Sequence, residues 1–167
     1  PDVRSTRMIF LDTNVILRYL TRSNDPVVQV MERQAAALFD VVERGEALVT
    51  TSEVVFHEAA YILMSNSHYG LERTRVAGYL SALLELGGLR LPRGERGILH
   101  RALELFENSR GLEMADCLVA ARSERLAIPL ASFDRSLAAL PSVEAWDPPV
   151  ELVEKTPEPP LVSEDRR

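Results

Sequence analysis

An α/β fold is predicted by three features of the sequence, with a central parallel sheet of four to five strands and helices on both faces. Short apolar segments alternate with longer segments in which apolar residues recur at helical spacing. Polar or turn residues bound the short segments, as is typical of strands buried in a parallel sheet. Proline, glycine and N-cap residues mark the ends of the longer ones. Together these features predict a three-layer domain.

The strands of this sheet are predicted at five places. The clearest candidates are MIFL (8–11), ALVT (47–50) and IPLA (128–131). LRL (89–91) and VEAW (143–146) are weaker candidates that would complete the sheet.

Five helices are predicted between and after these strands. Asp25-Pro26 supplies an N-cap followed by proline at the first helical position, and Gly45 supplies a stop. Gly87-Gly88 ends a later helix, and Gly111 separates two others. The predicted helices cover residues 26–44, 52–66, 71–86, 95–108 and 113–125.

A single domain over residues 8–146 is expected from the chain length of 167 residues. From Asp147 the sequence becomes rich in proline and charge, so residues 147–167 are expected to form a tail, flexible rather than wrapped around a surface. Residues 1–7 precede the first apolar segment and read as an upstream extension or a cloning remnant.

Composition excludes several functional classes. One cysteine, Cys117, rules out an internal disulfide and fits a reducing compartment. No segment has the length and apolar character of a membrane span or a signal peptide, so a cytoplasmic protein without membrane contact is expected. The net charge of −6 divides equally between residues 1–146 and residues 147–167. Bulk charge therefore does not favour nucleic-acid binding, although a bound divalent metal would supply local positive charge.

Two carboxylates are predicted on core-facing sides of helices. The helical neighbours of Glu58, namely Val54, Val55, Tyr61 and Ile62, are all apolar. Asp116 has the apolar helical neighbours Leu112, Val119 and Ala120. A buried carboxylate needs a cation or hydrogen-bond donors. The alternatives are a Glu58 side chain that reaches water and an Asp116 that pairs with an arginine.

Two further acids follow predicted strands. Asp12 comes directly after MIFL, and Asp134 follows IPLA and the dipeptide Ser132-Phe133. Ligands of open α/β sheets bind at the carboxyl ends of the strands. The alternative for each acid, taken alone, is N-capping of the helix that follows.

The four acids together favour a metal site. Like charges in one pocket raise each other's pKa unless a cation lies between them. Oxygen ligands suit Mg²⁺ or Mn²⁺, whereas no Cys/His cluster with zinc spacing is present. A carboxylate cluster around such a metal is typical of phosphoryl-transfer chemistry.

The motifs around these acids resemble a known family. "FLDTNVILRYLTRSNDP" resembles the opening of PIN-domain ribonucleases, most closely the VapC-type toxins of bacterial toxin–antitoxin pairs, with Asp12 as the first acid. Glu58 in "TTSEVVFHEAAYIL" and Asp116 in "GLEMADCLVAA" match the second and third acids. Ser132 and Asp134 in "LASFD" match a Thr/Ser-x-Asp element, with serine where threonine is common. Order and spacing agree across the domain.

The resemblance implies a function and its partners. It implies a metal-dependent endoribonuclease with an acidic pocket at the carboxyl ends of the strands, a homodimer, and inhibition by a cognate antitoxin. On this hypothesis Asp12 and Asp116 are the principal ligands of Mg²⁺ or Mn²⁺, and Glu58 and Asp134 complete the set directly or through water. The metal would activate a water for in-line attack on an RNA phosphodiester.

Three other residues are expected to contact the substrate or the ligands. Asn14 and Ser132 would hydrogen-bond a ligand carboxylate, a metal-bound water or the scissile phosphate. Arg18, one helical turn after Asn14, would contact the RNA backbone, or else is an ordinary surface arginine.

Three alternative functions remain open from the sequence. A phosphatase of the haloacid-dehalogenase type would need a second aspartate where Asn14 stands, and no catalytic lysine element is evident. A response-regulator receiver domain would need a phosphoacceptor on the ALVT strand. A non-catalytic PIN-like binding module would be favoured by loss of an acid, and all four are present.

Overall fold

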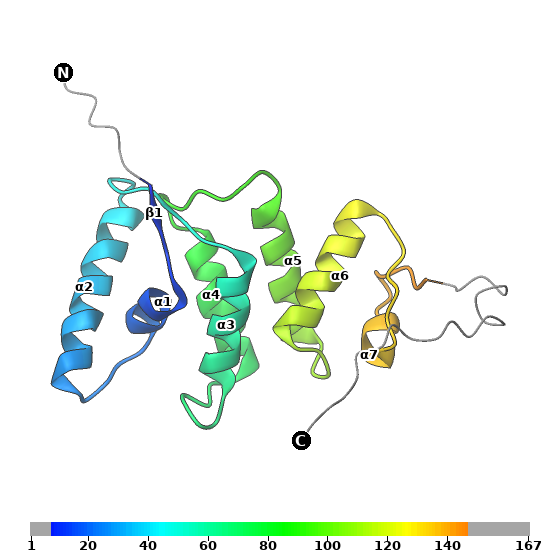
Figure 1. The fold of residues 1–167 in the computed structure, drawn as a ribbon, viewed down its shortest axis with the longest axis horizontal. Helices are drawn as coiled ribbons and strands as arrows, with labels where there is room; N and C mark the ends of the chain where they lie inside the picture. The colour runs from blue at the N-terminus through cyan, green and yellow to red at the C-terminus, as the bar shows by residue number, and fades with distance from the viewer. Residues whose placement is uncertain (1–7, 147–167) are drawn as a thin grey trace, which may run out of the picture.

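The computed structural model describes residues 8–146, which form seven helices and two short strands (Figure 1). The predicted tail at 147–167 and the segment 1–7 lie outside the described residues. The elements in chain order are β1 (Ile9–Phe10), α1 (Thr13–Leu20), α2 (Pro26–Glu43), β2 (Val49–Thr50), α3 (Glu53–Met64), α4 (Arg73–Leu84), α5 (Glu95–Asn108), α6 (Met114–Leu126) and α7 (Arg135–Ala138).

The sheet is parallel, as predicted. β1 pairs with β2, with Ile9 opposite Val49 and Phe10 opposite Thr50. Val49 also makes a parallel bridge to Leu89 on its other side, so the predicted segment 89–91 lies beside β2. A separate parallel bridge joins Leu130 to Ala145.

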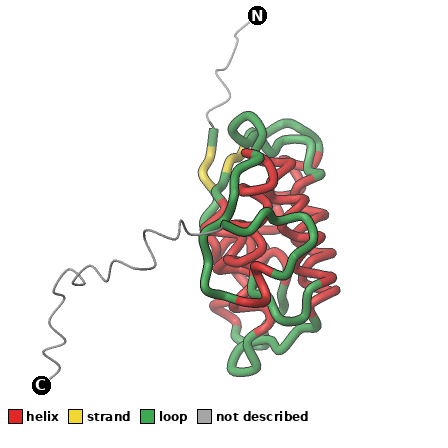
Figure 2. Tube along the Cα trace, turned by 90° about the vertical axis from the view of Figure 1, so that its right-hand side faces the viewer, coloured by secondary structure: helices red, strands yellow, loops and turns green. Residues whose placement is uncertain are grey.

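The number of strands differs from the prediction. Within residues 8–146 the sheet has two strands instead of four to five, and the other predicted segments make isolated bridges. The segments 128–131 and 143–146 pair with each other and not with β1. The reason is their position: they lie beyond α6, on the opposite side of α3, α4 and α5 from β1 (Figure 1). Figure 2 shows the two short strands at the margin of a body that is mostly helical.

The helices agree well with the predicted ranges. α2 to α6 begin and end within two residues of the predicted bounds. The Asp25 carboxylate accepts the backbone N–H of Val27 at 2.8 Å, and Pro26 occupies the first helical position, which confirms the predicted N-terminus of α2. Gly45 follows the helix with a positive φ of 72°, a conformation that glycine adopts without strain.

The core lies between the helices, and α3 has a central place in it. α3 contacts α1, α4 and α6, while α1 packs on α2 and α5 packs on both α4 and α6. The almost completely buried side chains of the core include Phe39, Phe56, Leu80, Leu99 and Phe106. Burial of each such side chain contributes roughly 1.5–3 kcal/mol. α3 is therefore a rigid support for the residues that project from its exposed side.

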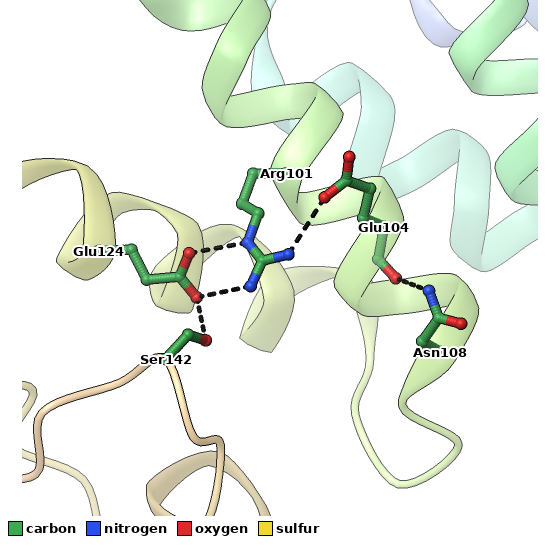
Figure 3. A network of polar contacts seen from close by, with 5 residues as sticks. All are labelled: Arg101, Glu104, Asn108, Glu124 and Ser142. Carbon is green, nitrogen blue, oxygen red and sulfur yellow. Dashed lines mark hydrogen bonds and ion pairs between the residues drawn. The ribbon is translucent and has the colours of Figure 1, made fainter.

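A polar network holds the segment after α7 against α5 and α6 (Figure 3). Arg101 of α5 donates from Nε to Glu124 of α6 at 2.8 Å and from Nη1 to Glu104 at 3.1 Å. The hydroxyl of Ser142 donates to the same Glu124 carboxylate. This network positions the segment after α7, whose residue Ala145 forms the bridge to Leu130.

Candidate functional site

Asp12 lies at the carboxyl end of β1, where the sequence predicted a ligand-binding acid. The backbone N–H of Leu11 donates to Thr50 at 2.8 Å, and the buried Thr51 hydroxyl donates to the Leu11 carbonyl at 3.1 Å, so the end of β1 is fixed. Asp12 is the N-cap residue of α1, but its side chain accepts no hydrogen bond from the helix N–H groups. Its exposed carboxylate therefore remains available for another ligand.

Thr13 connects this strand end to α3. Its side chain is almost completely buried, with 2% of its surface exposed, and its hydroxyl donates to Oε2 of Glu58 at 2.6 Å. The contact holds Glu58 beside the residue that follows Asp12, although 45 positions separate them in the chain. No role for Thr13 is predicted from the sequence. Its position directly after Asp12 is the feature that would have indicated a role in the site.

The predicted burial of Glu58 is wrong. Glu58 is exposed, because its apolar helical neighbours do not all face the core. Val55 is buried, whereas Val54 and Tyr61 are 65% and 63% exposed. Glu58 lies on the exposed side of α3 with these two residues, so its charge is solvated as well as hydrogen-bonded by Thr13.

Asp116 lies in the first turn of α6 and is half-buried. Its Oδ2 accepts the backbone N–H of Glu113 at 3.0 Å, so the carboxylate closes the start of the helix instead of pairing with an arginine. The neighbouring Cys117 is fully buried, and burial raises the pKa of its thiol to about 12. The thiol of Cys117 is therefore held in its protonated form within the core.

Asp134 caps α7, in agreement with the alternative that the sequence offered for it. Its Oδ1 accepts the backbone N–H groups of Ser136 at 2.7 Å and Leu137 at 3.3 Å. The Ser132 hydroxyl accepts the N–H of Asp134 at 3.0 Å. Both Ser132 and Asp134 thus stabilise the turn before α7.

Asn14 and Arg18 lie on α1, close to Asp12. The Asn14 amide donates to Oδ2 of Asp12 at 3.4 Å, a long hydrogen bond between exposed groups. Nη1 of Arg18 donates to the Tyr69 hydroxyl at 3.5 Å. The Nε of Arg18 is buried and has no hydrogen-bond partner within residues 8–146.

The four acids do not converge on one point in this structure. Across residues 8–146, no group of three or more His, Cys, Asp or Glu side chains could hold a metal ion. The Thr13 hydroxyl binds Glu58 at the start of α1, while Asp116 and Asp134 bind backbone N–H groups at the start of their own helices. Two carboxylates are a donor set that suits Mg²⁺, which commonly keeps several waters and takes one or two protein carboxylates. The chemistry of Asp12 and Glu58 thus fits a hard cation.

Comparison with known proteins identifies the family. Residues 9–142 match the PIN domain, which spans the strand end, both helices that carry acids and the capped turn at Asp134. The chain belongs to the PIN domain family. No curated protein and no solved structure matches it.

Membership of the PIN domain family favours the predicted resemblance over the phosphatase and receiver alternatives. It indicates a nuclease-type function, and PIN domain nucleases generally use divalent metals. The family likewise indicates binding of RNA. Within the described residues, no helix has both the length and the apolar character that crossing a membrane requires.

Proposed function

We propose that the protein is a metal-dependent endoribonuclease. The observation that carries the proposal is the PIN domain match over residues 9–142 together with Asp12, an uncapped acid at a strand end whose neighbour Thr13 binds Glu58. An acid in an N-cap position that leaves the helix N–H groups without its side chain forgoes about 1 kcal/mol of helix stability. A functional role for Asp12 accounts for that arrangement.

Mg²⁺ or Mn²⁺ is the proposed cofactor, with Asp12 and Asp116 as its principal ligands and Glu58 and Asp134 completing the set directly or through water. When bound, the metal supplies an activated water and positive charge for the phosphate oxygens. Thr13 holds Glu58 in place through its hydroxyl, and Asn14 orients the Asp12 carboxylate. Asn14, Arg18 and Ser132 are the proposed contacts to the substrate. The unpartnered Nε of Arg18 supports its part in this set.

A sheet of four to five strands is proposed for the metal-bound state. The edge of β1 that faces away from β2 has no strand partner within residues 8–146, and Ile9 and Phe10 are 41% and 62% exposed. Ile128 is also 50% exposed. Unpaired apolar edges favour pairing with another strand. Pairing of segment 128–131 with β1 would bring Asp134 to the sheet edge that carries Asp12.

A role as the toxin of a toxin–antitoxin pair is proposed with this activity, in the cytoplasm and as a homodimer. A cavity of about 520 Å³ between α1 and α2, lined by Asn14, Arg18, Gln34 and four apolar side chains, is the proposed antitoxin contact. Exposed Val54, Tyr61 and Val119 on α3 and α6 support self-association, because contiguous exposed apolar residues favour protein contacts.

Cleavage of a mixed pool of structured RNA tests the proposal. The purified protein is incubated with the pool in Mg²⁺, Mn²⁺ or EDTA, and the Asp12→Asn variant is run alongside. Cleavage that needs the metal and is lost in the variant is the expected result. Cleavage that persists in EDTA, or in the variant, would contradict the proposed metal site.

A second candidate is a PIN domain that binds RNA or protein without cleaving. The separation of the four acids in the structure favours it. Absence of cleavage in both metals, together with absence of metal binding by calorimetry, would support this candidate in place of the nuclease.

A further inference from the structure

Four arginines gather where the third parallel segment leaves the sheet. Arg90 and Arg96 lie on either side of the turn that leads into α5, Arg93 is in that turn, and Arg125 comes from the end of α6. We refer to Arg90, Arg93, Arg96 and Arg125 as the arginine patch. The patch stands out in a chain whose net charge is −6.

Two guanidinium groups of the patch converge on a single backbone oxygen. Nη1 of Arg90 donates to the carbonyl of Leu89 at 3.1 Å, and Nη2 of Arg96 donates to the same carbonyl at 3.0 Å. Arg90 also donates to the Gly87 carbonyl at 2.7 Å, which fixes its side chain. Two cations held this close repel each other, and an anion between them would remove the repulsion.

The described part of the chain supplies no such anion. Within residues 8–146, no carboxylate lies within 4.0 Å of any patch arginine, and the salt bridges involve Arg44, His100, Arg101 and Arg122. Glu95, the first residue of α5 and the acid that follows the turn, binds Arg122 at 3.0 Å. The positive charge of the patch is therefore not compensated by the acids around it.

The guanidinium group of Arg125, the fourth arginine of the patch, lies close to Gly94. Gly94 has a φ of 89°, and a Cβ at this position would lie 3.1 Å from Nη2 of Arg125. A Cβ here would force the Arg125 guanidinium to shift by a few tenths of an ångström, and the positive φ of Gly94 itself favours glycine. Arg125 thus extends the patch across the gap between α5 and α6.

Arg90 directly follows the segment that runs parallel to β1 and β2. Val49 has Ile9 on one side and Leu89 on the other, both parallel, so Asp12 and Arg90 follow strands that leave the sheet at the same edge. Two strand spacings, roughly 10 Å, separate Arg90 from Phe10, the residue level with it, and Asp12 lies two residues further along the chain. The other three patch arginines follow in the turn and on α5 and α6, which lie away from β1 (Figure 1).

We propose that the arginine patch binds phosphates of single-stranded RNA and so helps to hold the substrate of the proposed nuclease. This inference rests on the proposed nuclease function. It explains how a protein with a net charge of −6 binds RNA, which is itself negatively charged. Planar guanidinium groups suit phosphate oxygens, and each phosphate contact releases counterions, so binding through the patch must depend on salt.

The test is the salt dependence of RNA binding in EDTA, measured by the fluorescence anisotropy of a labelled single-stranded RNA. We compare the wild type with Arg90→Ala/Arg96→Ala and with the charge-matched control Arg33→Ala/Arg75→Ala, which removes two exposed arginines of α2 and α4. The slope of log K against log salt should fall by about 1.4 in the patch variant, since each single-strand phosphate contact contributes about 0.7. The control should keep the wild-type slope, and melting curves establish that both variants fold.

Each outcome separates this inference from the nuclease proposal. An unchanged slope in the patch variant, or an equal fall in the control, would overturn the patch. A patch-dependent slope without metal-dependent cleavage would uphold the patch and overturn the nuclease. Poly-glutamate serves as a second probe, and equal, patch-dependent affinity for it would overturn the assignment to RNA. A wild type that binds no RNA would overturn both.

Discussion

Asp12 and Asp134 occupy the same kind of position, before a helix and after an apolar segment, yet their carboxylates bind different groups. Asp134 accepts two backbone N–H groups of α7, whereas Asp12 accepts none from α1. Sequence could not separate the two cases, because an N-cap and a metal ligand require the same residue at the same place. The side-chain torsions that decide between them depend on the surrounding structure.

This difference predicts different effects on stability. Asp134→Ala should lower the free energy of unfolding by about 1 kcal/mol, since it removes an N-cap. Asp12→Ala should change the free energy of unfolding by less than about half of that, because no cap bond is lost. Urea denaturation followed by circular dichroism measures both. An equal loss in the two variants would contradict the contrast between the acids.

The Thr13 hydroxyl gives a second prediction at the residue scale. Thr13→Val keeps the shape of the side chain but removes the donor to Glu58. Cleavage and metal affinity should fall roughly 10- to 100-fold, as for other groups that orient a metal ligand. Thr13→Ser retains the hydroxyl and should restore most of the activity. The nuclease account would lose its positioning contact if Thr13→Val cleaved RNA and bound metal like the wild type.

At the scale of elements, α5 and α6 are joined to the segment after α7 by Glu124. Burial by itself raises the pKa of Glu124, but hydrogen bonds from Arg101 and Ser142, together with the arginine charge, outweigh it and hold the pKa below its ordinary value of 4.5. Because the folded pKa is lowered, the stabilisation is present above the unfolded pKa of 4.5 and is lost as the pH falls through the folded pKa.

A pH series of melting temperatures checks this prediction. Glu124→Gln should melt below the wild type at neutral pH, because it loses the ion pair with Arg101. The difference should shrink as the pH falls below 4.5 and the wild-type carboxyl becomes protonated. Glu107→Gln, an exposed position on the same helix as Arg101, is the control. A constant difference across the series would contradict the role of the charge.

The helices were more predictable than the strands for a physical reason. α2 to α6 each carry their own signal, a 3.6-residue apolar period with caps, and their hydrogen bonds are local. A strand two residues long carries no periodicity and depends on a partner far away in the chain. The sequence placed β1 and β2 correctly but could not determine which partner the segment 128–131 takes.

At the scale of the whole molecule, the predicted site differs from the observed one because the sequence does not determine where segment 128–131 pairs. Four like charges do not gather without a cation, since each raises the pKa of the others. The order of the motifs along the chain is enough to indicate the four acids. Whether their carboxylates converge depends on where the segments joined by the Leu130–Ala145 bridge pack in the fold. Glu58 also shows that apolar neighbours along a helix do not fix which side faces the core, since Val54 and Tyr61 are exposed.

Metal binding should therefore change the arrangement of the two ends of the molecule. Spin labels on Phe10→Cys and Ile128→Cys, both exposed positions, report the distance between β1 and segment 128–131. The native Cys117 is buried with a pKa raised to about 12, so it does not compete for the label. A short distance should appear when Mg²⁺ or Mn²⁺ is added. The same long distance with and without metal would contradict the completed sheet.

The most direct test of the central claim is RNA cleavage by Asp12→Asn, measured on the same preparation as its melting temperature. We expect cleavage to fall by roughly two to four orders of magnitude, since a bound metal contributes several kcal/mol to charge stabilisation. The melting temperature should stay at the wild-type value, because the Asp12 carboxylate makes no cap bond. Cleavage at the wild-type rate in a folded Asp12→Asn variant would contradict the assignment of Asp12 and, with it, the proposed metal site.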